Sequence, residues 1–380
     1  MKAGIITIHN SPNYGACLQS FALWKYITGQ GVDCEIIDLY RPYQKEYIPG
    51  RKFVPMRKQK HILPDTIKHA IKRLIGRNKE PKYFSDSAKE KFKKFNAPIK
   101  LSGTYRGIDE LYANPPLYDL YISGSDQVWN PSQPYCMEPY FLTFAPKDKV
   151  KISYAASIGL SGLRENEKTK FKEWLSAYTA ISVREKQGKA LLESFSGLEV
   201  EQVPDPALLL DAEDWKKWAE YPATNEPYIL LFTLSYSPEM VEYGKRLAQE
   251  AGIKLVVLGM IQPDCKDGSY LPITDAGPRE FLGYIAKARM VITDSFHGTV
   301  FSIITGVNNF YTYIAPANKR GSRILDLLDT FGLRDHLLPV NLKTGYTELN
   351  TRKIDHSLLI QIMKKEQMKG QEFLNRYIKP

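Results

Sequence analysis

The sequence has few cysteines, and they lie far apart. Cys17, Cys34, Cys136 and Cys265 form no CxxC pair and no Cys/His spacing typical of a metal site. This pattern predicts reduced thiols, a cytoplasmic protein and no bound metal. No stretch approaches the roughly 18 to 20 apolar residues that a membrane span requires. The opening residues, MKAGIITIHN, contain no long apolar region, so we expect no signal peptide.

Standard nucleotide-binding motifs are also missing. GxGxxG does not follow the first apolar run, and GxxxxGK[ST] is absent. We therefore expect no tightly bound cofactor.

Positive charge is present in excess and is unevenly distributed. The formal charge is +10, and residues 51–79 contain ten Lys/Arg and one Asp. Apolar residues recur there at helical spacing, opposite basic ones. One interpretation is a basic amphipathic helix that rests on an anionic membrane or a lipid-linked substrate. The simpler alternative is a surface helix that packs on its own domain. No nucleic-acid-binding motif accompanies the charge, so no nucleic-acid partner is expected.

The hydrophobic pattern predicts an α/β protein with two Rossmann-like domains and parallel sheets. Apolar strands alternate with helical segments from AGIITI (3–8) onward, and the alternation restarts at PYILLFTL (227–234). We predict an N-terminal Rossmann-like domain at 1–211 with a basic insertion at about 41–80, a C-terminal Rossmann-like domain at 212–345, and a C-terminal helix at 346–380. Ligands of such sheets sit beyond the carboxyl ends of the strands. The candidate loops are 9–15, 123–130, 155–159, 182–186 and 293–298.

Two of these loops carry groups suited to an anion. In the loop at 293–298, Ser295 and His297 precede a helix expected to start at Gly298 and Thr299, whose backbone N–H groups can bind phosphate or carboxylate. His297 is placed there to donate a proton, although it can also simply cap the turn. In the loop at 182–186, the guanidinium of Arg184 can grip an anion in bidentate fashion. It can equally form a structural pair with Glu185 or Asp205.

A third cationic group lies ahead of a later helix. It consists of Lys319, Arg320, Ser322 and Arg323. These residues can bind an anion, or they can simply form a solvated helix start. Together the three groups indicate a small, highly anionic ligand between the domains. From spacing alone, they predict a transferase or hydrolase that acts on a phosphorylated compound.

Seven segments in order resemble the polysaccharide pyruvyl transferase family. They are NYGACLQSFAL, YISGSDQVWNP, SYAASIG, SVREKQG, VPDPALLL, DSFHGTVFSIITG and NKRGSRILDLLDTFGL, which extend to about residue 335. The resemblance implies a GT-B-like arrangement of the two domains around an interdomain cleft. It also implies transfer of pyruvyl from phosphoenolpyruvate onto a sugar, which gives a ketal and releases phosphate. Members carry a histidine and an arginine at the positions of His297 and Arg184 at the phosphoenolpyruvate site.

The chemistry of the donor agrees with that implication. Phosphoenolpyruvate carries a carboxylate and a phosphate, so several cations and N–H donors are needed to hold it. We assign donor binding to Arg184, Ser295, His297, Gly298, Thr299, Lys319, Ser322 and Arg323. Protonation of the methylene carbon requires a general acid, assigned to His297. A base must then take the hydroxyl proton, and we assign that to Asp126, whose alternative role is turn capping.

The acceptor is expected on the first domain. The loop HNSPNYGACLQS offers a ring face at Tyr14 for a sugar and amides at Asn13 and Gln19 for its hydroxyls. Ser125 in the facing loop completes this set. The resemblance implies that the acceptor is a saccharide of a surface or cell-wall polysaccharide. A lipid-linked acceptor would bring the protein to the inner face of the membrane. Two alternatives stay open: a GT-B glycosyltransferase that uses a sugar nucleotide, and a non-catalytic saccharide-binding homologue.

Overall fold

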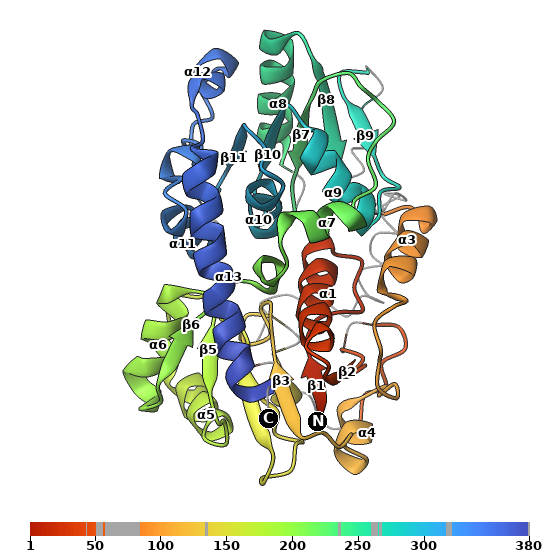
Figure 1. Ribbon diagram of the computed structural model, residues 1–380, viewed down its shortest axis with the longest axis vertical. Coiled ribbons are helices and arrows are strands. Elements are labelled where there is room, and N and C mark those ends of the chain that lie inside the picture. The colour runs from red at the N-terminus through yellow and green to blue at the C-terminus, as the bar shows by residue number, and fades with distance from the viewer. Residues whose placement is uncertain are drawn as a thin grey trace, which may run out of the picture.

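Two parallel β-sheets occupy opposite ends of the long axis of the molecule (Figure 1). The computed structural model describes residues 1–42, 44–50, 56–57, 84–133, 136–234, 237–259, 265, 268–316 and 321–378. The predicted basic helix in 51–79 lies outside the described residues apart from Met56 and Arg57. Lys319 and Arg320 lie outside them as well.

The first sheet has the strand order β2-β1-β3-β4, and every pairing in it is parallel. Its strands are β1 (Lys2–Ile6), β2 (Asp33–Ile36), β3 (Leu120–Ser123) and β4 (Val150–Ser153). Isolated bridges join the β4 edge to a further parallel pair, β5 (Ile181–Val183) and β6 (Val200–Gln202). The helices of this half are α1 (Tyr14–Gly29), α3 (Asp86–Asn96), α4 (Ile108–Ala113), α5 (Glu165–Leu175) and α6 (Lys186–Ser196).

The second sheet has the order β11-β10-β7-β8-β9 and is also parallel throughout. Its strands are β7 (Tyr228–Phe232), β8 (Lys254–Leu258), β9 (Leu271–Ile273), β10 (Met290–Thr293) and β11 (Phe310–Thr312). Its helices are α8 (Pro238–Ala251), α9 (Pro278–Lys287), α10 (Phe296–Thr305) and α11 (Ser322–Thr330). The central strands are buried on both faces, which explains their continuous apolar runs. The predicted α/β fold with two parallel sheets is confirmed.

The chain crosses between the halves twice. After β6, a short 3-10 helix at Pro206–Leu209 and α7 (Ala212–Trp218) lead to the second sheet. After a 3-10 turn at Arg334–His336 and α12 (Tyr346–Thr351), the helix α13 (His356–Ile378) runs back along the first half (Figure 1). There Gln367 and Gln371 donate to the carbonyl of Leu209 at 3.1 and 3.2 Å. The limits 1–211, 212–345 and 346–380 remain predictions.

The interface between the halves is packed with aromatic side chains. Tyr14, at the start of α1, stacks on Phe281 of α9 with ring centroids 4.5 Å apart. Its hydroxyl donates to the carbonyl of Ala276 at 2.8 Å. Trp215 of α7 contacts Phe301 of α10 edge-on at 5.0 Å. One hydrophobic cluster therefore runs through both halves, and it fixes how the strand ends of the two sheets face each other.

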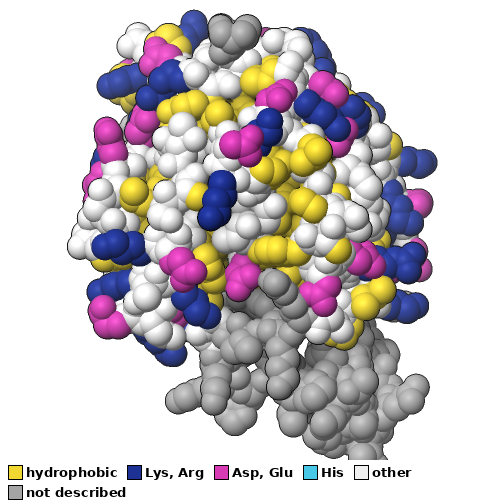
Figure 2. Space-filling view, turned by 90° about the horizontal axis from the view of Figure 1, so that it is seen from below, with side chains coloured by type: hydrophobic (Ala, Val, Ile, Leu, Met, Phe, Trp, Pro, Cys, Tyr) yellow, Lys and Arg dark blue, Asp and Glu magenta, His cyan; other side chains and the backbone are white. Residues whose placement is uncertain are grey.

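The lower end of the molecule carries charges of both signs. Figure 2 views this end and shows Lys and Arg side chains interspersed with Asp and Glu and with apolar patches. Membrane contact therefore remains a prediction that rests on residues 51–79. Within the described part of the chain, no helix is long and apolar enough to cross a membrane.

Candidate active site

The predicted catalytic groups come together where the strand ends of the first sheet meet the start of α10. Arg184 follows β5, Asp126 follows β3, and His297 lies in the first turn of α10. Asp205, which follows β6, contacts both Arg184 and His297, and Asp126 contacts Arg184. The distances are 2.5 Å from Arg184 Nη1 to Asp205 Oδ2, 3.4 Å from His297 Nε2 to the same oxygen, and 3.7 Å from Arg184 Nη2 to Asp126 Oδ1.

Asp205 is the centre of this arrangement. Its side chain is fully buried, and its Oδ1 accepts a hydrogen bond from the backbone of Ala207 at 3.0 Å. This bond caps the turn that Pro206 begins. Burial alone raises the pKa of Asp205, but attraction to His297 and Arg184 together with the hydrogen bonds holds that pKa well below its usual range. The carboxylate therefore stays charged and leaves Oδ2 for the two functional side chains.

Arg184 is a buried cation with unused hydrogen-bonding capacity. Burial alone lowers its pKa, but the carboxylates of Asp205, Glu185 and Asp126 raise it above the usual value. Nη1 binds Asp205, which confirms the alternative of a structural pair with that residue. None of the described residues offers a hydrogen-bond partner to Nε or Nη2. The fold thus uses Nη1 in a hydrogen bond, and the N–H groups of Nε and Nη2 remain available to bind an anion.

Phe296 brings a second guanidinium to the same place. Arg184 lies 4.3 Å from the centroid of the Phe296 ring, and Arg323 of α11 lies 5.5 Å from it. Both guanidiniums are at least nine-tenths buried. Arg323 thus lies against the same ring as Arg184, and both line one cavity. Phe296 was missed because an apolar residue in an apolar segment gives no signal of this contact.

The start of α1 lies directly against His297. A Cβ atom added to Gly15 would lie 2.0 Å from His297 Nδ1. Because Nε2 faces Asp205, Nδ1 is the ring nitrogen that faces the strand-end loop of the first half. Glycine at position 15 is therefore needed for this close approach, a role that the sequence alone did not reveal.

Asp126 sits in a constrained loop and is partly exposed. Its φ is +67°, and Ala155 in the neighbouring strand-end loop has a φ of +49°. Such angles are uncommon for these residues and cluster at functional sites. The Asp126 side chain is 17% exposed, whereas those of Arg184 and Asp205 are buried. It is therefore placed to meet a molecule that approaches Arg184 from solvent.

The predicted acceptor residues do not form the expected open surface. Tyr14 is 3% exposed and its ring is covered by Phe281, so the expectation of a free ring face for a sugar is wrong. Gln19 is fully buried and donates to Thr7, Ile8 and Ala16. Ser125 is also buried and donates to Ala155 at 2.9 Å. Asn13 is exposed and caps α1 through Ala16.

Several predicted donor residues use their polar groups within the protein. The helix begins at Phe296 rather than Gly298, because the Ser295 hydroxyl caps it by accepting from Gly298 N at 3.2 Å. The hydroxyl of Thr299 bonds to Ser295 O and Thr312. An anion site built from Ser295, Gly298 and Thr299 is therefore not supported. Ser322 is the first residue of α11, and Lys319 lies outside the described residues.

A small cavity adjoins the buried guanidiniums. It measures about 30 Å³, and its lining includes Arg184, Asp205, Phe296, Arg323 and Asp326. A space of this size holds about two or three water molecules. A phosphorylated three-carbon compound therefore needs the surrounding elements to move before it can occupy this side of Arg184.

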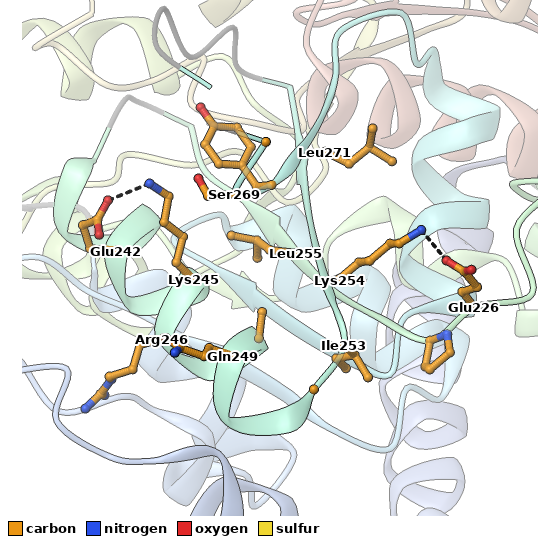
Figure 3. Close-up of a pocket in the computed structure, with 15 residues that line it drawn as sticks. Glu226, Glu242, Lys245, Arg246, Gln249, Ile253, Lys254, Leu255, Ser269 and Leu271 are labelled. Atoms are coloured by element: carbon orange, nitrogen blue, oxygen red, sulfur yellow. Dashed lines mark hydrogen bonds and ion pairs between the residues drawn. The ribbon is translucent and has the colours of Figure 1, made fainter. Parts of the chain in front are cut away.

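A larger hollow lies elsewhere, between α8, β8 and β9 (Figure 3). It measures about 1200 Å³, and ion pairs join Lys254 to Glu226 and Lys245 to Glu242 on its walls. Lys254 begins β8, so this hollow reaches the amino end of the strand, opposite the end where α/β sheets bind ligands. We do not assign the reaction to it.

Comparison with solved structures identifies the fold. Arabidopsis thaliana UGT89C1 in complex with quercetin is 12% identical with a TM-score of 0.51, covering 99% of both chains. A UDP-GlcNAc 2-epimerase from Methanocaldococcus jannaschii, in complex with UDP-GlcNAc and UDP, is 13% identical with a TM-score of 0.50, covering 96% of this chain and 99% of its own. S. aureus MnaA with UDP is 9% identical with a TM-score of 0.52, covering 98% and 95%. These likenesses show a GT-B-like fold and nothing finer.

Sequence comparison is more specific. No curated protein matches the chain closely enough to serve as a relative. The family model for polysaccharide pyruvyl transferase matches residues 13–314, which include Arg184, Asp205 and His297. The match covers well over half of the 380 residues. The chain therefore belongs to the polysaccharide pyruvyl transferase family.

Proposed function

We propose that the protein transfers the pyruvyl group of phosphoenolpyruvate onto a saccharide of a surface or cell-wall polysaccharide, forming a ketal and releasing phosphate. One observation carries the proposal. A buried arginine, two of whose nitrogens make no hydrogen bond to the described residues, shares a carboxylate with a histidine at the carboxyl ends of the strands. Buried cations with unused donors suit an anion, and the neighbouring imidazole suits proton transfer to it.

The reaction uses these groups in sequence. His297 donates a proton to the methylene carbon of the donor, which leaves an oxocarbenium-like centre at the adjacent carbon. An acceptor hydroxyl attacks that centre and gives its proton to Asp126. A second hydroxyl displaces the phosphate and gives its proton to it, so that hydrogen phosphate departs while Arg184 and Arg323 neutralise its charge. The proton held by Asp126 returns to His297 before the next turnover. Asp205 is a positioning residue, because it holds His297 and Arg184 through one oxygen.

The acceptor is proposed to approach over Asp126 and the exposed Asn13, since Tyr14 and Gln19 are covered. No cofactor or metal enters this scheme. Cytoplasmic location, a lipid-linked acceptor and contact with the membrane remain predictions from the sequence. The main alternative, a sugar-nucleotide glycosyltransferase, is supported only by the GT-B-like fold, which the chain shares with its structural neighbours at 9–13% identity.

The proposal is tested by phosphate release. Purified protein is incubated with phosphoenolpyruvate and a panel of β-galactosides and N-acetylmannosamine-bearing lipids. We expect His297→Gln to lower the rate by about 10²- to 10⁴-fold, the usual range for a lost general acid. Its matched control is His356→Gln, which changes an exposed histidine bonded to Asn308. Titration calorimetry with UDP-sugars tests the alternative: binding of these, and none of phosphoenolpyruvate, would contradict the proposal.

Gly15→Ala tests the contact between α1 and the imidazole. The added methyl group would overlap His297 Nδ1, so the ring must move. Because a misplacement of about 1 Å can cost 10²-fold, we expect kcat to fall by about that factor while the protein stays folded. Gly29→Ala is the control, since its Cβ would meet nothing within 4 Å. Equal kcat values for both variants would show that His297 is not held in place by α1.

Asp205→Asn tests the shared carboxylate through stability. At pH 7, loss of the charge leaves Arg184 poorly compensated, and we expect the free energy of unfolding to fall by roughly 3 kcal/mol. The depressed pKa means that Asp205 contributes fully above the ordinary carboxyl pKa of about 4 and loses its contribution as the pH falls below it. Denaturant titrations at several pH values should show the free energies of unfolding of wild type and Asp205→Asn converging from about pH 4 downward. If the difference between these free energies stayed constant to pH 3, the charged pair would be refuted.

A further inference from the structure

The two halves also meet where α11 touches the start of α6. The Lys186 backbone N–H at the start of α6 donates to Asp326 Oδ2 of α11 at 2.9 Å. The N-cap residue of α6, Glu185, supplies no side-chain cap. A helix start carries unpaired N–H groups and partial positive charge. A carboxylate from the other half of the molecule therefore occupies a position that suits an anion.

This helix start adjoins the unused side of Arg184. Arg184 precedes Lys186 by two residues and is 5% exposed. Its Nε and Nη2 have no hydrogen-bond partner among the described residues, and Nη2 has only the 3.7 Å ion pair with Asp126. Arg323 lies one helical turn before Asp326 on α11. Both arginines and Asp326 line the same cavity of about 30 Å³. Two buried guanidiniums thus face one small space, which the carboxylates of Asp205, Asp326 and Glu366 also line, and Asp326 connects this space to the start of α6.

Asp326 is held in this place at an electrostatic cost. Burial raises its pKa, and the backbone N–H groups of Lys186 and Gln187 offset this only in part. A phosphate dianion would bring more charge and more acceptor oxygens to the same donors than one carboxylate does. The cavity is too small for phosphate. Phosphate can therefore enter only if α11 moves and Asp326 withdraws from the start of α6.

We propose that the start of α6, together with Arg184 and Arg323, is a phosphate-binding site that Asp326 occupies in the closed protein and vacates when phosphate enters. The shared chemistry is a phosphate group, which belongs either to the donor or to the released product. Assigning it to the donor rests on the proposed function, whereas the site itself does not. Asp326 thereby competes with the ligand and lowers its apparent affinity.

The test compares Asp326→Asn with Asp329→Asn in the full-length protein. Asp329 lies one turn further along α11 and pairs with the exposed Arg334, so its variant removes the same charge without touching α6. Inorganic phosphate and phosphoenolpyruvate are titrated by calorimetry at one pH and ionic strength. We expect Asp326→Asn to bind phosphate about tenfold more tightly than wild type, and Asp329→Asn to stay within twofold of it.

The two ligands separate the sources of the phosphate group. If Asp326→Asn binds both ligands more tightly than wild type, the donor binds at this site. If it binds only inorganic phosphate more tightly, the site belongs to the released product. Either result supports the site, even if no pyruvyl transfer is found, in which case only the proposed function falls. Equal phosphate affinities for Asp326→Asn and Asp329→Asn would overturn the inference and leave Asp326 as a structural cap.

A measurement on the wild type decides the matter if Asp326→Asn does not fold. Phosphate, compared with chloride at equal ionic strength, should increase hydrogen–deuterium exchange in peptides of α11 and decrease it at the start of α6. Unchanged exchange in both helices at saturating phosphate would contradict displacement of Asp326.

Discussion

The site depends on one buried carboxylate shared by two functional side chains. Asp205 belongs to the connection after β6, Arg184 to the end of β5, and His297 to the first turn of α10. A buried charge is costly unless it is paired, so these three segments must assemble together. Pro206 and the hydrogen bond from Ala207 fix the carboxylate itself. The relative position of imidazole and guanidinium is thus set by the backbone and does not depend on a bound substrate.

The loop after β1 has a role that differs from the expected one. Tyr14 inserts into aromatic side chains of the second half, and Gly15 lets the helix approach His297. The loop therefore helps to hold the two halves together and lies against His297, the proposed general acid. We propose instead that the acceptor sugar binds at the partly exposed surface near Asp126. The same closeness of the halves accounts for the small cavity beside Arg184, which requires movement of α11 before a ligand enters.

Much of the fold was predictable because both sheets are parallel and buried, and their strands read as continuous apolar runs. The exposed edge strand β9 was missed, since Leu271 and Pro272 are solvent-exposed and carry no such signal. Residue type and position at a strand end or helix start led to the predictions for Arg184, Arg323 and His297, whose roles stay predictions. The pair between Asp205 and Arg184 was one of the alternatives read from the sequence. The contact of Asp205 with His297 was not predictable, because the two residues come from segments distant in sequence. The prediction for Tyr14 was wrong because an aromatic residue at a helix start suits a sugar-binding surface and a protein interface equally, and its partner Phe281 is distant in sequence.

The central claim is that Arg184 divides its nitrogens between a structural carboxylate and the donor. A crystal structure with phosphoenolpyruvate bound tests this most directly. We predict donor oxygens within hydrogen-bond distance of Arg184 Nε or Nη2, Nη1 still on Asp205, and the His297 ring over the methylene carbon. A donor bound elsewhere, with Arg184 unchanged in its ion pair and His297 out of reach, would contradict the account.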